Sequence, residues 1–440
     1  MVRLFGYFCC ALFLLITSLS CDSTETPPIV PPPDLRKITL SVEDVSCTEV
    51  WLSIKADSIT FPSEIILLKD TVAQTINLCC SDTTLYIDSL LPNKPYNYKA
   101  ILTADTTIKS ETVTAQTLDT TSHNFSWQSW TFGEHSSSVL YDVAIIDENN
   151  IWAVGEIYMN DSLGNPDSKL YNLIKWNGTE WKQERIYFTN SQGQSFLATM
   201  KSIFAFDAND IWIGQDQLIH WDGSDYIEYE LSDEVFQSWV NKIWGTSSED
   251  LYVVGNTGNI AHYSGPSGGW QKIESGTDLN IYDIWGDVNQ QTGEYEIILL
   301  ASDHVSTNGT KLFLINNSSS IEISSEGLPL SMNSLWFKSN RFYMAVGDGY
   351  YTTKQLGNGW IRDYTIPFFY KTTIRGINYN DIFLAGTFGL LMHNNGVEWK
   401  SYQYTVTTSE DFFSKVSLSN NIICAVGARN NNAVIYIGKR

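Results

Sequence analysis

From residue 140 onward, short hydrophobic runs alternate with polar turns, and one pattern recurs along the chain. A hydrophobic run meets an Asn/Asp-rich turn, and a second hydrophobic run follows that usually ends in Gly. Seven copies occupy residues 143–155, 203–214, 243–255, 284–302, 335–347, 374–386 and 416–427. Such alternation predicts antiparallel β-strands. A repeat of about forty residues in β-type sequence predicts the blades of a β-propeller.

Each repeat divides into four predicted strands. In the first repeat these strands are residues 140–146, 151–156, 173–176 and 181–185. An Asn-Gly or Asp-Gly pair, such as Asn177-Gly178, separates the third strand from the fourth, and such pairs favour tight hairpins. The last repeat lacks a fourth strand, whereas residues 125–131 form a predicted strand without a sheet. Because unpaired edge strands are aggregation-prone, we predict that residues 125–131 pair with residues 433–438 and close a seven-bladed ring over residues 119–440.

The region before the repeats has its own strand pattern. Residues 36–118 divide into predicted strands at 38–42, 49–56, 64–69, 74–78, 84–87, 96–104 and 111–117. Strands of this number and length predict an immunoglobulin-type sandwich, with Trp51 as its core aromatic residue. The turn of Leu90, Pro92 and Tyr96 resembles the turn into the sixth strand of fibronectin type III domains. That resemblance implies a hydrogen bond between the Tyr96 hydroxyl and the backbone. The chain is therefore predicted to be all-β, an immunoglobulin/fibronectin III-like sandwich followed by a seven-bladed β-propeller.

The N-terminus has the features of a secretory signal. Residues 1–20 begin with the positive charge of Arg3 and continue with an apolar stretch that is too short to span a membrane. The segment closes on Cys21 and resembles a bacterial lipoprotein signal, although Ser18 stands where Leu is usual. The resemblance implies an acylated Cys21, followed by a Pro-rich tether over residues 21–35. We expect an exported lipoprotein of the bacterial outer membrane or cell surface; the alternative is an ordinary cleaved signal.

The charge of the chain limits its partners. It carries 49 acidic and 27 basic residues, a formal net charge of −22. A surface of this sign repels nucleic acid and anionic lipid headgroups, so we expect neither as a partner.

Cysteines and histidines do not have metal-site spacing. Export allows disulfides, and Cys47 could pair with either Cys79 or Cys80, whereas Cys424 lies in an apolar strand and is expected to be a buried thiol. Three histidines occupy equivalent places in separate repeats, which argues against a shared zinc ion: His220, His262 and His393.

One arginine stands out among the predicted innermost strands. Trp244, Trp285 and Trp336 share one repeat position, where we expect them to fill gaps between blades, but the sixth repeat has Arg375 there. A buried cation without a partner is costly, so Arg375 should pair with a carboxylate or face the channel and bind an anion. Sialidases clamp a carboxylate with three arginines, and one inner-strand arginine argues against that activity.

Other candidate sites are weaker. Trp239 and Tyr226 are candidate stacking platforms for a sugar ring. The loop over residues 160–167 offers oxygen ligands at spacings that suit calcium, with Asp161, Asn165 and Asp167 as candidate ligands, but it lacks the full EF-hand pattern. We expect no other cofactor. No nucleophile elbow, P-loop, dinucleotide fingerprint or HExxH motif is present.

Resemblance places the repeats in a broad group. Residues 353–360 resemble a degenerate Asp-box, with Gln355 at the Asp position. The repeat is similar to sialidase-like and photosystem-assembly-factor-like propellers of exported bacterial proteins. The whole architecture resembles exported lipoproteins that join a fibronectin type III-like module to such a propeller, some of which carry a glucosyltransferase label. We predict a lipid-anchored binding or scaffolding protein for a carbohydrate or an envelope protein. The alternative is a carbohydrate-active enzyme, a glycosyl hydrolase or glucosyltransferase, that uses carboxylates on a propeller face.

Overall fold

The computed structural model describes residues 35–440 except residues 190–191, 304–308 and 317. The predicted signal, Cys21 and nearly all of the predicted tether lie outside the described residues. Within the described residues, no helix is both long and apolar enough to cross a membrane.

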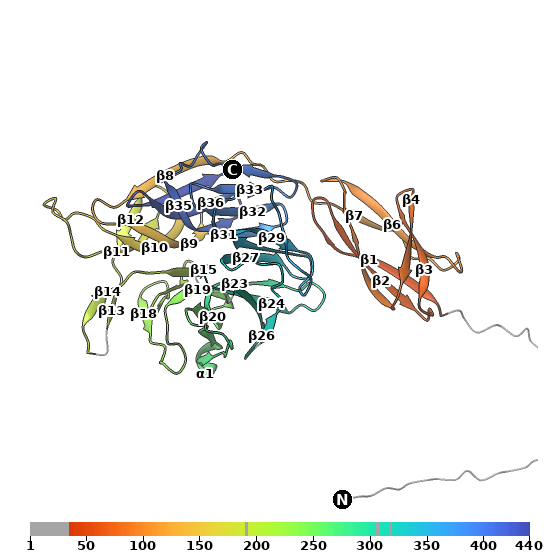
Figure 1. Cartoon of the computed structure of the whole chain (residues 1–440), viewed down its shortest axis with the longest axis horizontal. Coiled ribbons are helices and arrows are strands. Elements are labelled where there is room, and N and C mark those ends of the chain that lie inside the picture. Colours follow the sequence, from red (N-terminus) through yellow and green to blue (C-terminus); the bar gives the residue numbers. More distant parts are fainter. Residues whose placement is uncertain (1–34, 190–191, 304–308, 317) are drawn as a thin grey trace, which may run out of the picture.

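The N-terminal module is a sandwich of two sheets (Figure 1). Its strands are β1 (Lys37–Val45), β2 (Val50–Asp57), β3 (Ser63–Lys69), β4 (Val72–Leu78), β5 (Asp82–Ile87), β6 (Pro95–Leu102) and β7 (Val113–Gln116). One sheet has the order β1-β2-β5 and the other β4-β3-β6-β7. Alternate residues of β2, including Leu52 and Ile54, point between the sheets into one hydrophobic core. The backbone N–H of Leu91 donates to the Tyr96 hydroxyl at 2.9 Å, which confirms the predicted turn hydrogen bond.

The rest of the described chain forms seven four-stranded sheets arranged in a ring. In chain order the strands are β8 (Ser126–Phe132), β9 (Val139–Asp147), β10 (Asn150–Ile157), β11 (Tyr171–Trp176), β12 (Trp181–Glu184), β15 (Ser202–Asp207), β16 (Asp210–Gly214), β17 (Leu218–Trp221), β18 (Tyr226–Tyr229), β19 (Val240–Ser247), β20 (Asp250–Gly255), β21 (Ile260–Tyr263), β22 (Trp270–Lys272), β23 (Asn280–Val288), β24 (Tyr295–Ser302), β25 (Thr310–Asn316), β26 (Ser319–Ile323), β27 (Met332–Lys338), β28 (Phe342–Gly347), β29 (Gly349–Thr353), β30 (Ile361–Arg362), β31 (Lys371–Asn378), β32 (Asp381–Gly386), β33 (Leu391–Asn394), β34 (Trp399–Ser401), β35 (Asp411–Ser419), β36 (Ile422–Arg429) and β37 (Asn432–Lys439). A hairpin of β13 (Tyr187–Thr189) and β14 (Ser195–Leu197) and a one-turn helix, α1 (Gly265–Gly268), extend from connecting loops. This is the architecture of a β-propeller.

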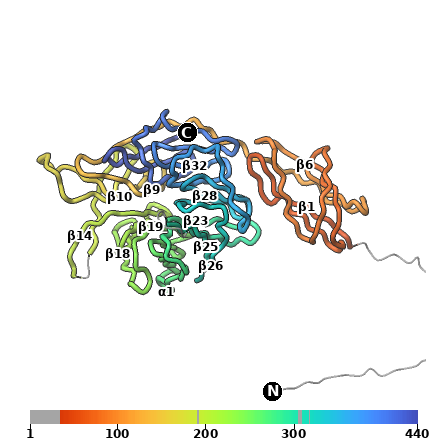
Figure 2. Tube along the Cα trace, viewed as in Figure 1, coloured from red at the N-terminus to blue at the C-terminus, as the bar shows by residue number. Residues whose placement is uncertain are grey.

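The ring is closed. Each innermost strand contacts the innermost strand of the next sheet, in the order β9, β15, β19, β23, β27, β31 and β35, and β35 contacts β9. The trace in Figure 2 follows the same order from yellow through green to blue. The seventh sheet has the order β35-β36-β37-β8, and β8 pairs with β37 from Ser126 opposite Lys439 to Phe132 opposite Ala433. The predicted closing pair is therefore confirmed.

Large side chains and glycines fit the blades together. A side chain at Gly286 would collide with the ring of Trp244 from the preceding blade, and one at Gly376 would collide with Trp336. These tryptophans fill the spaces between blades, as predicted. Steric crowding also explains why Gly ends the second strand of most repeats. A Cβ at Gly155 would collide with the backbone carbonyl of Val139, where the innermost strand begins.

The module packs on turns at one end of the ring. Arg341, in the turn between β27 and β28, contacts Glu43 at 3.1 Å and Asp44 at 3.4 Å. The hydroxyl of Tyr379, in the turn between β31 and β32, donates to Asp44 at 2.7 Å. Trp51 stacks on Tyr379 with 5.7 Å between ring centroids.

The prediction that Trp51 belongs to the module's core is wrong. Its neighbours Val50 and Leu52 occupy that core, and side chains alternate between the faces of a strand, so Trp51 points to the opposite face. The propeller covers that face, and Trp51 is therefore buried in the contact between the two parts.

Candidate functional site

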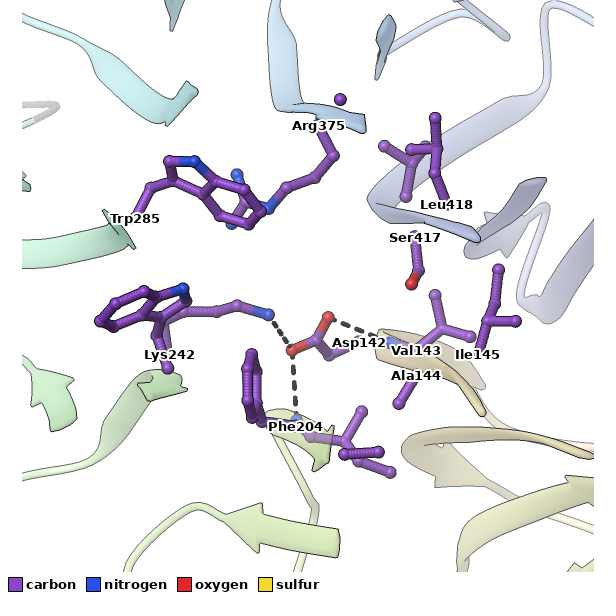
Figure 3. Close-up of a pocket in the computed structure, with 15 residues that line it drawn as sticks. Asp142, Val143, Ala144, Ile145, Phe204, Lys242, Trp285, Arg375, Ser417 and Leu418 are labelled. Carbon is purple, nitrogen blue, oxygen red and sulfur yellow. Dashed lines mark hydrogen bonds and ion pairs between the residues drawn. The ribbon is translucent and has the colours of Figure 1, made fainter. Parts of the chain in front are cut away.

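The axis of the ring has a cavity at each end. The first, which we call the Arg375 cavity, has a volume of about 220 Å³ and lies where the innermost strands end. Its polar lining includes Asp142, Lys242 and Arg375, and its aromatic lining includes Trp244 and Trp285 (Figure 3). The second, which we call the Lys415 mouth, has a volume of about 350 Å³ and lies where the innermost strands begin.

Two buried carboxylates, Asp142 and Asp283, lie between these openings, and each is paired with a cation and accepts further hydrogen bonds. Asp142 accepts hydrogen bonds from Lys242 Nζ at 2.7 Å, from the Ser202 hydroxyl at 3.3 Å and from the backbone N–H of Ile203 at 3.2 Å. Figure 3 shows the side chains of Asp142 and Lys242 pointing toward each other. Asp142 and Lys242 therefore form a buried ion pair.

Asp283 repeats this arrangement three blades later. It accepts hydrogen bonds from Arg375 at 2.9 Å, from the Ser334 hydroxyl at 2.6 Å and from the backbone N–H of Leu335 at 3.0 Å. Burial alone would raise the pKa of Asp283, but the charges of Arg375 and Lys415 lower the pKa to about 2. In both clusters, an Asp of one blade meets a Ser of the next blade and a cation of the blade after that.

The seventh blade contributes a third cation without a carboxylate of its own. Lys415 holds the same strand position in β35 as Asp142 in β9 and Asp283 in β23. Among the described residues, its ammonium group has no hydrogen bond or ion pair. Burial lowers the pKa of Lys415 to about 8; the carboxylate of Asp283 opposes this shift, and the charge of Arg375 adds to it.

A repeated β-bulge shapes the Lys415 mouth. In six innermost strands, one residue just before the polar position is skipped by the pairing with the second strand. These residues are Tyr141, Asn241, Tyr282, Asn333, Thr372 and Ser414, and all six line the mouth together with Lys201, Tyr370, Phe412 and Lys415. A bulge re-aims a side chain, which explains why this irregularity recurs at the axis.

The lining of the mouth is cationic. Among the described residues that line it are Lys201 and Lys415, and none is an Asp or a Glu. Lys201 places its Nζ 3.5 Å from the ring centroid of Tyr141. In a chain of net charge −22, this is a local reversal of sign.

Exposed aromatic side chains lie at the end of the ring where the innermost strands begin, in loops at this end and, for Phe412, on β35 itself. They are Trp239, Tyr364, Phe368, Phe388, Tyr404 and Phe412, and Phe368 is 78% exposed. Phe412 also lines the mouth. Exposed aromatic side chains gathered on one surface are typical of binding sites.

The residues predicted as binding candidates separate into different regions. Arg375 lies on an innermost strand and is paired with Asp283, which is one of the two outcomes expected for it. Trp239 is 56% exposed directly before β19, at the same end of the ring as the Lys415 mouth. Tyr226 lies on the outer strand β18, where its ring packs on Trp221.

Two of the predicted calcium ligands, Asp161 and Asp167, already have protein partners. Asp161 accepts hydrogen bonds from the backbone N–H groups of Leu163 and Asn165, both at 2.9 Å. Asp167 is paired with Arg185 at 2.6 Å. In the part of the chain that the structure describes, no group of three His, Cys, Asp or Glu side chains is placed to hold a metal ion.

The repeat-equivalent histidines bind within their own blades. His220 contacts Asp210 at 2.9 Å, His262 contacts Asp250 at 2.7 Å, and His393 contacts Asp381 at 3.1 Å. Each of these His–Asp pairs lies within one sheet, and His393 also contacts His123 at 2.8 Å.

The four cysteines within the described residues are free. Cys47 is buried against the propeller, with its thiol 3.8 Å from the carbonyl of Asn395, whereas Cys79 and Cys80 are exposed. Neither bridge considered for Cys47 is formed. Cys424 is buried, as predicted.

Comparisons with known proteins give the fold. No protein-family model and no curated protein matches the chain. The structure "YCF48 bound to D1 peptide" is similar over 73% of this chain and 99% of that chain, with 14% identity and a TM-score of 0.52. "YCF48 from Cyanidioschyzon merolae" is similar over 70% of this chain and 98% of that chain, with 12% identity and a TM-score of 0.51. The repeat region is a β-propeller. At these identities the likeness shows the fold alone.

Sequence reasoning missed the buried charges of the propeller. Superimposing the repeats places Asp142, Ser202, Lys242, Asp283, Ser334, Thr373 and Lys415 at one position, directly before the hydrophobic run. The recurrence of a polar residue at this position in every repeat, beside an apolar run, was the signal in the sequence that could have indicated buried polar groups. The pairing among them could not be read from the sequence, because it depends on side chains reaching across two blades.

Proposed function

We propose that the protein is a lipid-anchored binding or scaffolding protein of the bacterial cell envelope and that its propeller binds a polypeptide segment at the Lys415 mouth. The observation that carries this proposal is the set of exposed aromatic side chains around a cavity whose lining includes two lysines. Aromatic groups supply much of the energy in protein interfaces, and polar groups at the centre supply specificity.

The position of the N-terminal module supports the end of the ring with the Lys415 mouth as the binding end. The module contacts Arg341 and Tyr379, which lie in turns at the opposite end of the innermost strands. The Lys415 mouth is therefore left uncovered. A propeller solved with a bound peptide, "YCF48 bound to D1 peptide", provides a precedent for polypeptide binding by this architecture.

The module and the anchor complete the proposal. The sheet orders β1-β2-β5 and β4-β3-β6-β7 and the bond to Tyr96 support a fibronectin type III-like domain over residues 36–118. The N-terminal sequence supports acylation of Cys21. The tether would then join the membrane to the module, which positions the propeller.

The buried carboxylates give little support to a glycosidase. Such an enzyme needs one carboxyl group that remains protonated near neutral pH to act as the acid. Asp283 has a pKa of about 2, and both Asp283 and Asp142 already bind cations. A binding role therefore fits these residues better.

A capture experiment with matched variants tests the proposal. The full chain in detergent is screened against a displayed peptide library and a glycan array. Phe368→Ala, Trp239→Ala and the control Tyr295→Ala, which is exposed at the opposite end of the ring, are tested in parallel. We expect peptide capture to weaken about tenfold in the first two variants and to remain unchanged in the control. Glycan binding without peptide binding would contradict the proposal.

A further inference from the structure

We propose that the Lys415 mouth binds a carboxylate side chain of an acidic polypeptide segment, with Lys415 and Lys201 as the groups that bind the carboxylate. This inference rests on the proposed function and adds the chemical class of the ligand. The buried charges along the axis of the ring are the first observation that supports it.

The described groups at the polar repeat position and Arg375 leave one positive charge uncompensated. The carboxylate of Asp142 is paired with Lys242, and that of Asp283 is paired with Arg375. Each pair joins three consecutive blades, so six blades form two complete clusters. The seventh blade then supplies Lys415 alone. A partly buried cation without a counter-charge is costly, and a bound anion would relieve that cost.

The walls of the mouth favour the same ligand. Lys201 and Lys415 line the mouth and have no ion pair among the described residues. The amide N–H groups of Asn241 and Asn333 already donate hydrogen bonds within the ring, so the two lysines are the donors that can meet an anion. The described lining contains no carboxylate that would repel an anion. Because the chain as a whole is strongly acidic, a cationic lining here is specific to the mouth and does not reflect the composition of the surface.

The arrangement is less suited to a neutral sugar. Sugar hydroxyl groups need acceptors as well as donors, and the described lining lacks the carboxylates that most often accept from them. The ring of Tyr141 has Lys201 Nζ over its face at 3.5 Å, so that face is not open for stacking. An acidic side chain needs donors and positive charge, and both are present.

The size and surroundings of the site fit a side chain carried by a longer chain. The mouth holds about 350 Å³, and Phe412 connects its lining to the exposed aromatic side chains of the surrounding loops. A segment bound across those loops could insert one carboxylate at the axis. The aromatic contacts would supply affinity, and the two lysines would select the acidic residue.

A pair of peptides tests the charge directly. A rhodamine-labelled peptide of alternating Phe and Glu residues is compared with a version in which Gln replaces every Glu. Binding to the full chain in detergent is followed by fluorescence anisotropy. We expect the Glu peptide to bind at least about tenfold more tightly, which is the effect of one charge-assisted contact.

Variants assign the preference to the mouth. Lys415→Met keeps a long apolar side chain and removes the charge, so it should abolish the preference for Glu without weakening the Gln peptide. Lys201→Met should reduce the preference. The control Lys400→Met removes an exposed lysine from the outer strand β34 and should leave the preference intact. Thermal unfolding of each variant checks the fold, and Lys415→Met should be at least as stable as the parent, because it removes an unpaired charge.

The outcomes separate the two proposals. Equal binding of both peptides, or a preference that survives in Lys415→Met, would overturn the carboxylate site and leave polypeptide binding in place. Tighter binding of an oligogalacturonate than of the Glu peptide would overturn the polypeptide class. Failure of both peptides to bind would count against both proposals.

Discussion

Replacing Asp283 with asparagine should destabilise the propeller strongly. The carboxylate is fully buried and accepts hydrogen bonds from Arg375, Ser334 and Leu335. Asparagine has nearly the same shape but no charge, so Arg375 would remain buried beside Lys415 without its counter-charge. Removing one partner of a buried ion pair typically costs about 3–5 kcal/mol, and we expect a loss of that size in the free energy of unfolding.

A control on the same strand isolates the effect of burial. Asp287 also lies on β23, where it pairs with Lys338 at 2.7 Å, but its side chain is 18% exposed. Ion pairs in contact with solvent contribute about 0–1 kcal/mol, so Asp287→Asn should cost about 1 kcal/mol at most. The two variants make the same chemical change in one strand and differ in burial and in the number of partners.

Urea unfolding followed by tryptophan fluorescence measures the difference. The signal reports the ring, because Trp51 is the only tryptophan of 15 that lies outside residues 119–440. Adding Arg375→Met to Asp283→Asn should recover part of the lost stability, since the unpaired cation is then removed. Equal losses in Asp283→Asn and Asp287→Asn, or no recovery in the double variant, would refute the role assigned to this ion pair.

Three further results are expected. Burial lowers the pKa of Lys371 and Lys415 to about 8, from 10.5 when unperturbed. Between these values the unfolded chain holds protons that the folded chain has released, so the stability of the parent relative to Lys371→Met or Lys415→Met, measured by urea unfolding, should rise from pH 8 toward pH 10. A relative stability that falls over this range would contradict the burial of these lysines. Ile435 is fully buried on β37, opposite Trp130 of β8, and Ile435→Ala should cost about 2–5 kcal/mol. Ile321→Ala at an exposed site should cost less than about 0.5 kcal/mol. Similar costs would argue against the closing pair. Iodoacetamide should label Cys79 and Cys80 in the folded protein, because both are exposed. It should reach Cys47 and Cys424 only after unfolding, because these two are buried and burial raises the pKa of Cys47 to about 11. If mass spectrometry finds Cys47 labelled as fast as Cys80, its placement against the propeller is wrong.

The sequence carried enough information to predict the ring and its closure. The forty-residue spacing and the polar turns are local signals, and the closing pair followed because the last repeat lacked a strand that residues 125–131 could supply. The position of Trp51 could not be predicted from such local signals. Its burial was predictable from its size, but its partner was not, because the face of β2 that it occupies is covered by a turn more than three hundred residues later in the chain.

The candidate site was predictable only in part. Arg375 was identified because it replaced an aromatic residue in the repeat, and the choice between pairing and anion binding remained open until Asp283 was located beside it. Lys415 was missed because a lysine in a strand of mixed polarity has no distinctive signal by itself. Lys415 is important because its ammonium group has no ion-pair partner among the described residues. Only the folded ring shows this, since the two nearby carboxylates are already paired with Lys242 and Arg375.

The strand that closes the ring also sets the order in which the propeller can assemble. Strand β8 is the first strand of the propeller along the chain, and its partner β37 is the last. During synthesis, β8 therefore has no sheet partner until residues 432–439 have emerged, even if the intervening blades have already formed. A chain truncated just before residue 432 would keep nearly all of its blades but would leave β8 and β36 with unpaired edges, and such edges are prone to aggregate.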